Sequence, residues 1–204
     1  KSFEAALLKG IRSLEIGQYG LERKSSKART LEELKRRVVV PDDERLFDLA
    51  EMLRRGYKEE KVCQITGRDL FFVDKINKID KMEVELKNIK VEEFTEESLS
   101  YYKEKGFSDK AISNFVGCKP PEIYALRKKW NIMPVFKMVD TCAGEFEAVT
   151  PYYYSSYDSE TEVRVSDMKK LMVIGSGPIR IGQGIEFDYC SVHCIKALKK
   201  AGIE

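Results

Sequence analysis

Residues 170–189, KLMVIGSGPIRIGQGIEFDY, decide how this chain is organised. Residues 171–174 form a short apolar run of branched side chains, which is typical of a buried parallel strand. Glycines and a proline then interrupt the run. From residue 185 to 201 apolar residues recur at helical spacing, and Gly202 follows as a helix C-terminal cap. The stretch predicts a strand, a glycine-rich turn and a helix, the opening unit of a nucleotide-fold sheet.

A single strand and helix cannot bury both faces of the strand. The sequence stops at Glu204, before a second strand could follow. We therefore expect a piece of a larger protein that begins in one domain and ends in the next. Helix signals dominate the chain as far as Asn131, so the expected fold is mainly α-helical with a truncated α/β unit after it.

The start of the chain predicts three helices. Ser2 is placed to cap a first helix, and Thr30 begins a capping box with Glu33 for a second. Residues 23–28 are polar and are expected to form a loop. The first helix is expected to have one apolar face, formed by Phe3, Ala6, Leu7, Ile11 and Leu14. A third helix is expected from Pro41, with Leu46, Leu49, Ala50 and Leu53 on one side.

A duplication with a period of fifty residues follows. Gly56-Tyr57 corresponds to Gly106-Phe107, and Gly67 corresponds to Gly117. Each copy predicts a helix, a glycine–aromatic turn, a short helix, a second glycine and a longer helix. The apolar positions also correspond, namely Val62 with Ile112, Ile65 with Phe115, Val73 with Ile123, and Ile76 with Leu126. Two similar helical hairpins on a shared core explain the pattern, although chance similarity is an alternative at this length.

The second copy also has the pattern of a helix-turn-helix, the alternative from a different functional class. Arg127, Lys128 and Lys129 would lie on its second helix. A DNA-reading helix places its base contacts at its N-terminal end, and Pro120, Pro121 and Glu122 occupy those positions here. The basic residues instead lie where they complement the helix dipole. A structural role is therefore favoured over DNA binding.

After Trp130 the pattern changes from helical to extended. Val135, Phe136, Met138 and Val139 form an apolar run, and four tyrosines lie within residues 152–157, which favours strands over helices. These segments are expected to connect two domains. Their tyrosines could fill the seam between domains, which is favoured, or serve a partner surface. Residues 159–167 are polar and are expected to be the linker.

The composition fits a water-soluble protein of the cytoplasm. Charged residues make up 34% of the chain, but 36 basic and 34 acidic residues leave a net charge of +2, which disfavours nucleic-acid binding. No apolar run approaches the ~20 residues of a membrane span, and the N-terminus has no signal-peptide pattern. The five scattered cysteines indicate free thiols in a reducing compartment.

Three stretches resemble the large-subunit family of carbamoyl phosphate synthetase. Residues 175–193, GSGPIRIGQGIEFDYCSVH, are similar to the start of the family's second synthetase half. Residues 135–146, VFKMVDTCAGEF, are similar to the linker before that half. The opening KSFEAALLKGIRSLEIG is similar to the junction after the first half. The stretches keep the family's order, so the resemblance covers nearly the whole chain.

The resemblance implies that residues 1–163 are the family's helical oligomerisation domain with extended linker segments. Residues 164–204 would begin the pre-ATP-grasp, Rossmann-like domain of the carbamoyl-phosphate half. The parent enzyme would make carbamoyl phosphate from bicarbonate, glutamine-derived ammonia and two ATP, with Mg²⁺ or Mn²⁺, for pyrimidine and arginine biosynthesis. Its partners would be the rest of the large subunit and a glutaminase small subunit. The chain alone is expected to be a self-associating scaffold without catalysis, bound cofactor or metal.

The resemblance also implies roles for the glycine-rich loop of Gly175, Gly177, Gly182 and Gly184. By position, Ile179, Arg180 and Gly184 would border the tunnel or active site, with Glu186 and Asp188 bracing it. Tight packing of helix on strand explains Gly175 and Gly177 equally well. The loop completes neither a dinucleotide fingerprint, since Arg180 stands at the third glycine position, nor a P-loop.

Two further candidates are weaker. Cys190, His193 and Cys194 have a metal-like spacing, but four ligands are not available nearby, so packing in a core is favoured over zinc. Cys142 lies beside Asp140 and Thr141 without a base to activate its thiol, so a catalytic nucleophile is not expected.

Overall fold

The computed structural model describes residues 2–149, 152–175 and 186–204. It divides into two compact units, Lys1–Glu162 and Val163–Glu204. Each unit is described by itself. Helices make up most of the described chain, and the prediction of a mainly α fold is confirmed. None of the described helices combines the length and the apolar character needed to cross a membrane.

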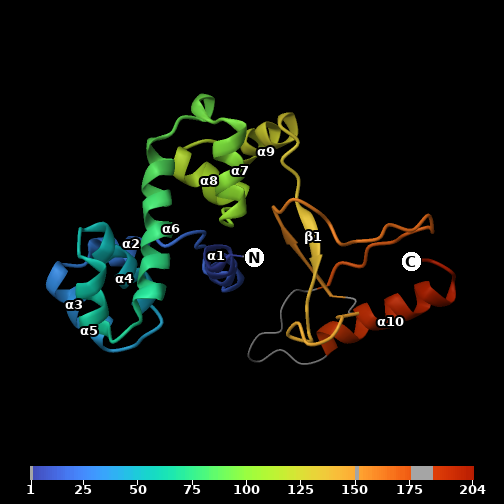
Figure 1. Ribbon diagram of the computed structural model, residues 1–204, viewed down its shortest axis with the longest axis horizontal. Helices are drawn as coiled ribbons and strands as arrows, with labels where there is room; N and C mark the ends of the chain where they lie inside the picture. The colour runs from blue at the N-terminus through green and yellow to red at the C-terminus, as the bar shows by residue number, and fades with distance from the viewer. Residues whose placement is uncertain (1, 150–151, 176–185) are drawn as a thin grey trace. The chain divides into compact units, whose positions relative to one another are not determined.

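The first unit contains nine α-helices, one 3-10 turn and two strands among its described residues (Figure 1). The helices are α1 (Phe3–Ser13), α2 (Lys24–Ala28), α3 (Leu31–Val39), α4 (Arg45–Arg54), α5 (Glu59–Thr66), α6 (Leu70–Asn88), α7 (Glu96–Glu104), α8 (Asp109–Val116) and α9 (Pro120–Lys129). The turn η1 is Val91–Glu93, and the strands are β1 (Val135–Met138) and β2 (Tyr153–Ser156). Within this unit α6 lies between the group α2–α5 and the group α7–α9 (Figure 1).

The two predicted helix starts at Ser2 and Thr30 are confirmed. The hydroxyl of Ser2 accepts from the backbone N–H of Ala5 at 3.1 Å. Thr30 and Glu33 form the full capping box, with Thr30 N–H donating to the Glu33 carboxylate at 2.7 Å. The predicted loop at 23–28 is wrong. Its residues form α2, because Arg55 binds the carbonyls of Lys27 and Arg29 and so holds the end of this helix.

Helix α4 begins at Arg45 and not at Pro41. Leu49, Ala50 and Leu53 are buried as predicted, and Leu46 packs against the core from a half-buried position. Burial extends almost around the helix, because Phe47 and Met52 on its other sides are also buried.

The predicted apolar face of α1 is confirmed only in part, at Ile11 and the half-buried Leu7. Leu14 is 60% exposed and Ala6 is exposed, whereas Ala5, Leu8 and Ile11 are buried. The buried stripe is rotated because α1 has two close neighbours on that side. Glu4 pairs with Lys75 of α6 at 3.1 Å, and Ala5 packs against the backbone of Gly106. Both stripes have helical spacing, so periodicity alone did not distinguish them.

The predicted duplication is confirmed. Helices α4, α5 and α6 are followed by α7, α8 and α9 in the same order, and α5 and α8 each have eight residues. Gly56 and Gly106 have φ of +88° and +94°. In both copies the N–H of the aromatic residue after the glycine closes the helix, Tyr57 to the Met52 carbonyl at 3.1 Å and Phe107 to the Tyr102 carbonyl at 3.0 Å. This is the Schellman arrangement.

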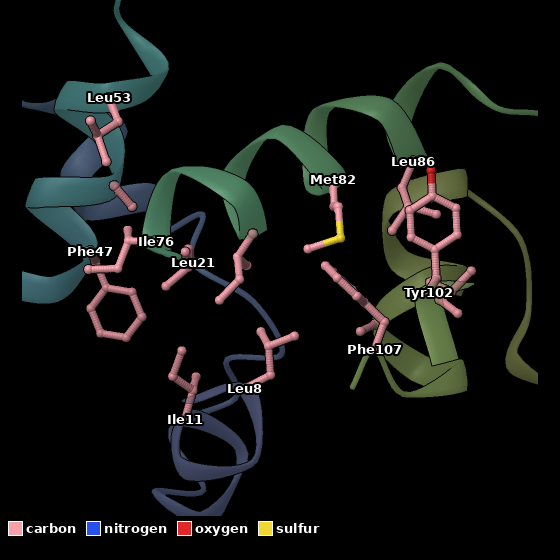
Figure 2. Close-up of a cluster of buried hydrophobic side chains, with 14 of the residues drawn as sticks. Leu8, Ile11, Leu21, Phe47, Leu53, Ile76, Met82, Leu86, Tyr102 and Phe107 are labelled. Carbon is pink, nitrogen blue, oxygen red and sulfur yellow. The ribbon is translucent and has the colours of Figure 1, made fainter. Parts of the chain in front are cut away.

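The corresponding apolar residues of the two copies occupy corresponding places in one core. Val62, Ile112, Val73 and Ile123 are all 0% exposed. Helix α6 forms the centre of this core (Figure 2). It lies between Phe47 and Leu53 at one end and Tyr102 and Phe107 at the other, with α1 alongside. The shared core favours a true structural repeat over chance similarity.

The two strands form an antiparallel ladder in the first unit. Val135 pairs with Ser156 and Met138 pairs with Tyr153. The extended character predicted for both segments is confirmed. Beyond β2, Tyr157 packs against the helical core, with Lys103 Nζ lying 4.9 Å from its ring centroid and Arg127 Cζ 5.7 Å.

The second unit contains helix α10 (Glu186–Lys200) among its described residues. The predicted cap at Gly202 is confirmed, with φ of +73° and an N–H donated to the Lys199 carbonyl at 3.1 Å. The predicted strand at 171–174 is wrong. No described strand lies beside it to form a ladder, and Leu171 N–H donates instead to the carbonyl of Glu204 at 2.8 Å.

The repeat offers a matched test of close packing. A Cβ on Gly106 would lie 2.4 Å from Ala5 Cα, whereas a Cβ on Gly56 would meet nothing within 4 Å. Both positions have positive φ, so alanine at either should cost about 1–2 kcal/mol of backbone strain. We expect Gly106→Ala to lower the free energy of unfolding by at least about 1 kcal/mol more than Gly56→Ala, because overpacking adds to the strain. Urea denaturation measures this difference, and equal losses would contradict the packing of α1.

A second expectation concerns the core. Every buried hydrophobic residue in the described chain lies at or before Ile132. We therefore expect a version ending at Glu162 to melt within a few degrees of the full chain. Circular dichroism at 222 nm measures both melting temperatures, and a large decrease on shortening would show that the second unit supports the helical core.

Candidate functional site

The predicted tunnel border lies mostly outside the described residues. This applies to Gly177, Ile179, Arg180, Gly182 and Gly184. The backbone of Glu186 and Asp188 belongs to the first turn of α10. Gly175 is described and exposed, and a Cβ there would lie 4.0 Å from the Ser191 hydroxyl. Packing therefore does not require a glycine at 175, and the roles implied for the loop stay predictions.

The cysteines near the C-terminus do not lie in a core, contrary to the prediction. Cys190 and Cys194 are exposed on α10, whose Val192 and Ile195 are 45% and 41% exposed. The helix has few packing partners inside its own unit, so its thiols face solvent. Tyr189 and His193 stack with ring centroids 4.1 Å apart. No group of three metal-ligating side chains occurs among the described residues.

The helix-turn-helix alternative gains no support from the geometry of α8 and α9. Arg127 is 8% exposed. It donates two hydrogen bonds to the Asp109 carboxylate, from Nε at 2.9 Å and from Nη2 at 2.8 Å. Its third nitrogen donates to the Ile132 carbonyl at 3.0 Å. At the other end of α9, the Glu122 carboxylate accepts from the Lys119 N–H at 2.7 Å. Arg127 is therefore engaged within the fold, whereas Lys128 and Lys129 are exposed at the C-terminal end of α9.

The helical unit exposes large apolar side chains at the start of α6. Leu70, Phe71 and Phe72 are 48%, 52% and 47% exposed. Phe3 of α1 joins them, with ring centroids 5.7 Å from Phe71 and 5.6 Å from Phe72. We call these four residues the aromatic patch. Contiguous exposed apolar side chains of this kind mark interfaces more often than free surface.

A buried network of charges ties the N-terminal segment to α4 and α6. The Glu83 side chain is 0% exposed and accepts from the N–H groups of Leu21, at 2.5 Å, and Glu22, at 3.1 Å. Arg54 of α4 donates to Glu83 at 3.2 Å and also pairs with Asp80. Gly20 makes room for this contact, since a Cβ there would lie 2.3 Å from the Glu83 carboxylate.

The network has an excess of acid over base. Burial raises the pKa of Glu83 to about 8, more than the bonds from Leu21 and Arg54 lower it. Burial also raises the pKa of Asp80. Arg54 Nε is buried and has no hydrogen-bond partner among the described residues. Such a network fixes the geometry of the segment that connects α1 to α2.

The chain matches two family models. Residues 1–131 match "Carbamoyl-phosphate synthetase large chain, oligomerisation domain", and residues 167–204 match "Carbamoyl phosphate synthase preATP-grasp domain". Proteins named carbamoyl phosphate synthase large chain are similar along the whole of it. Those of Clostridium botulinum (strain Loch Maree / Type A3), Clostridium perfringens (strain SM101 / Type A) and Clostridium beijerinckii are 61%, 59% and 57% identical over 203 residues.

The chain belongs to the carbamoyl phosphate synthase large-chain family. It is covered completely by each of these alignments and spans 19% of the length of the relatives. The family resemblance predicted from the three sequence stretches is confirmed. The helical unit described above contains the match to the oligomerisation domain, and α10 lies within the match to the preATP-grasp domain.

Sequence reasoning missed the buried network of this family member. The available signal was the spacing of Ile76, Asp80 and Glu83, which places the two acids in the same helical stripe as a core residue. An acidic residue in a core stripe predicts a buried partner, but the partner, Arg54, lies 29 residues from Glu83 in the sequence. Only the packing of α4 on α6 brings them together.

The raised pKa of Glu83 predicts a pH dependence of stability. The folded chain keeps the proton on Glu83 up to about pH 8, whereas the unfolded chain loses it near pH 4.5. Between these values the folded state binds more protons, so this group favours folding less as the pH rises. We expect the free energy of unfolding to fall, relative to Glu83→Gln, from pH 5 to pH 8.

Urea denaturation of both proteins at pH 5, 6, 7 and 8 measures this difference. Glu85→Gln is a matched control, because Glu85 lies on the same helix and is exposed. A difference between wild type and Glu83→Gln that stays constant with pH would show that Glu83 is ionised throughout.

Proposed function

We propose that this chain is the association and connecting segment of a carbamoyl phosphate synthase large chain. In this role the helical unit joins subunits, and residues 164–204 lead into the second synthetase half. The observation that carries the proposal is the aromatic patch on a unit that matches the family's oligomerisation domain. A second copy would remove Phe71 and Phe72 from water. Because each is already about half buried, the gain is about half of the roughly 1.5–3 kcal/mol for burying a fully exposed side chain.

The parent activity belongs to the same proposal. The large chain would make carbamoyl phosphate from bicarbonate, glutamine-derived ammonia and two ATP, with Mg²⁺ or Mn²⁺, for pyrimidine and arginine biosynthesis in the cytoplasm. A glutaminase small subunit would supply the ammonia. The segment itself would contribute no catalytic group, and the glycine-rich loop would border the tunnel. Support comes from the names of the relatives, which are large chains of this synthase.

Self-association is the testable part of this proposal. We expect concentration-dependent dimerisation of the chain, since a closed two-fold contact is the commonest arrangement. The version ending at Glu162 should dimerise equally, because the aromatic patch lies in the helical unit. Sedimentation velocity from micromolar to hundreds of micromolar protein measures the association of both.

The contact is located by substitution. The double variant Phe71→Ser, Phe72→Ser should weaken dimerisation by at least about tenfold, the equivalent of 1.4 kcal/mol. Tyr124→Ser is the matched control, because Tyr124 is a 45% exposed aromatic residue on α9 outside the patch. Strict monomers at every concentration would rule out association through this segment alone. Dimers unaffected by the double variant would place the contact elsewhere on the helices.

A further inference from the structure

A cavity of about 780 Å³ lies in the first unit, beside the second glycine–aromatic turn. Its wall comes from α1, α7, the segment after α9 and the end of β2. Cavities of this size are large enough to hold a small molecule. None of the residues that line the cavity belongs to the aromatic patch, so the function of the cavity is an independent question.

Three cations gather in and next to this cavity near the half-buried carboxylate of Asp109. Lys103 lines the cavity and is 4% exposed, with Nζ 2.7 Å from Asp109. Arg127 does not line the cavity, but its Nη2 lies 2.8 Å from the same Asp109 carboxylate. Arg12 lines the cavity from α1 and donates one nitrogen to the Gly106 carbonyl at 3.0 Å. Asp109 can neutralise only one of these charges.

Arg12 is the cation that lacks a counter-ion. Within residues 2–149, 152–175 and 186–204, no carboxylate lies within 4.0 Å of its guanidinium. Burial lowers the pKa of Arg12, and burial together with Arg127 and Arg12 lowers the pKa of Lys103. Partly buried cations of this kind are stabilised by an anion that accepts charge-assisted hydrogen bonds.

We propose that the cavity binds a small oxyanion, a phosphate or a carboxylate, between Arg12 and Lys103. The Arg12 nitrogens that do not bind Gly106 offer a planar fork suited to two oxygens of such a group. Lys105, which also lines the cavity, adds a third positive charge. Three exposed acids, Glu96, Glu104 and Asp158, also line the cavity. They oppose the binding of any anion, so the site depends on direct hydrogen bonds from Arg12 and Lys103.

The fluorescence of a tryptophan in the cavity wall can measure ligand binding. Trp130 lines the cavity and is the one tryptophan of the chain. Titration of the full chain with inorganic phosphate, at ionic strength held constant with potassium chloride, should change Trp130 fluorescence along a saturable curve. Acetate as a second probe distinguishes the two sources of the oxyanion. A lower dissociation constant for phosphate than for acetate assigns a phosphate ligand, and the reverse order assigns a carboxylate ligand.

Substitutions decide whether the binding is at this site. Arg12→Gln should weaken the preferred anion by at least about tenfold, because one charge-assisted hydrogen bond is lost. Arg36→Gln, an equal change of charge on exposed Arg36 of α3, should leave the affinity unchanged. Lys105→Gln provides a second variant that keeps the Arg12–Gly106 bond, and it should weaken binding in the same direction. Circular dichroism confirms the fold of each variant.

Three results would overturn the proposal. The first is the absence of a saturable change with either anion. The second is a change that potassium chloride alone reproduces. The third is binding that neither Arg12→Gln nor Lys105→Gln weakens more than Arg36→Gln does.

Discussion

The burial of helix α6 along its whole length is the constraint on which the helical unit depends. Val73, Ile76, Ile79, Met82 and Leu86 are buried in sequence along it. Helices α1, α4, α5 and α8 all pack on it. Helix α1 contacts its first turns, where Phe3 meets Phe71 and Phe72. A helix of 19 residues is about 28 Å long. It therefore reaches from one copy of the repeat to the other, and neither copy has a core without it.

The parts of this design that the sequence predicted are those set by local chemistry. Capping by Ser2 and Thr30, the turns at Gly56 and Gly106, and the cap at Gly202 each follow from a few neighbouring residues, and each was predicted correctly. The repeat was also predictable, because the glycine–aromatic pair and the apolar positions that follow it recur together fifty residues later. In each case the residue type and the required backbone conformation coincide, so little tertiary information was needed.

The errors arose where distant residues decide the outcome. The buried face of α1 is set by Lys75 and Gly106, which are far from it in the sequence. Helix α2 is too short to form by propensity, and Arg55 holds its end. The segment 171–174 has a strand composition, but a strand needs a neighbour, and its backbone bonds instead to residue 204. The tunnel border depended on the family resemblance, and most of its residues lie outside the described chain.

The helical unit has two charged clusters whose excess charges have opposite signs, one around Arg54 and one around Asp109. The cluster of Arg54 contains three buried acids, Glu51, Asp80 and Glu83, of which Glu51 also pairs with Arg55. Burial, with a smaller contribution from the charge of Asp80, favours a proton on Glu83. The cluster of Asp109 contains one acid and an excess of cations. There hydrogen bonds from Arg127 and Lys103 outweigh burial and hold the pKa of Asp109 below its usual value.

Loss of a proton from Lys103, whose pKa burial lowers, can remove one of the positive charges around Asp109, but Arg12 and Arg127 keep theirs at any pH at which the chain is folded. The charge of Arg12 is offset only by an added anion or by greater exposure to water. Arg12 is already only half exposed and is tied to the Gly106 carbonyl, which itself belongs to the turn packed against Ala5. Moving Arg12 toward water would therefore disturb the packing of α1 on the second copy of the repeat. The same contact that fixes α1 also holds an unpaired cation at the edge of a cavity.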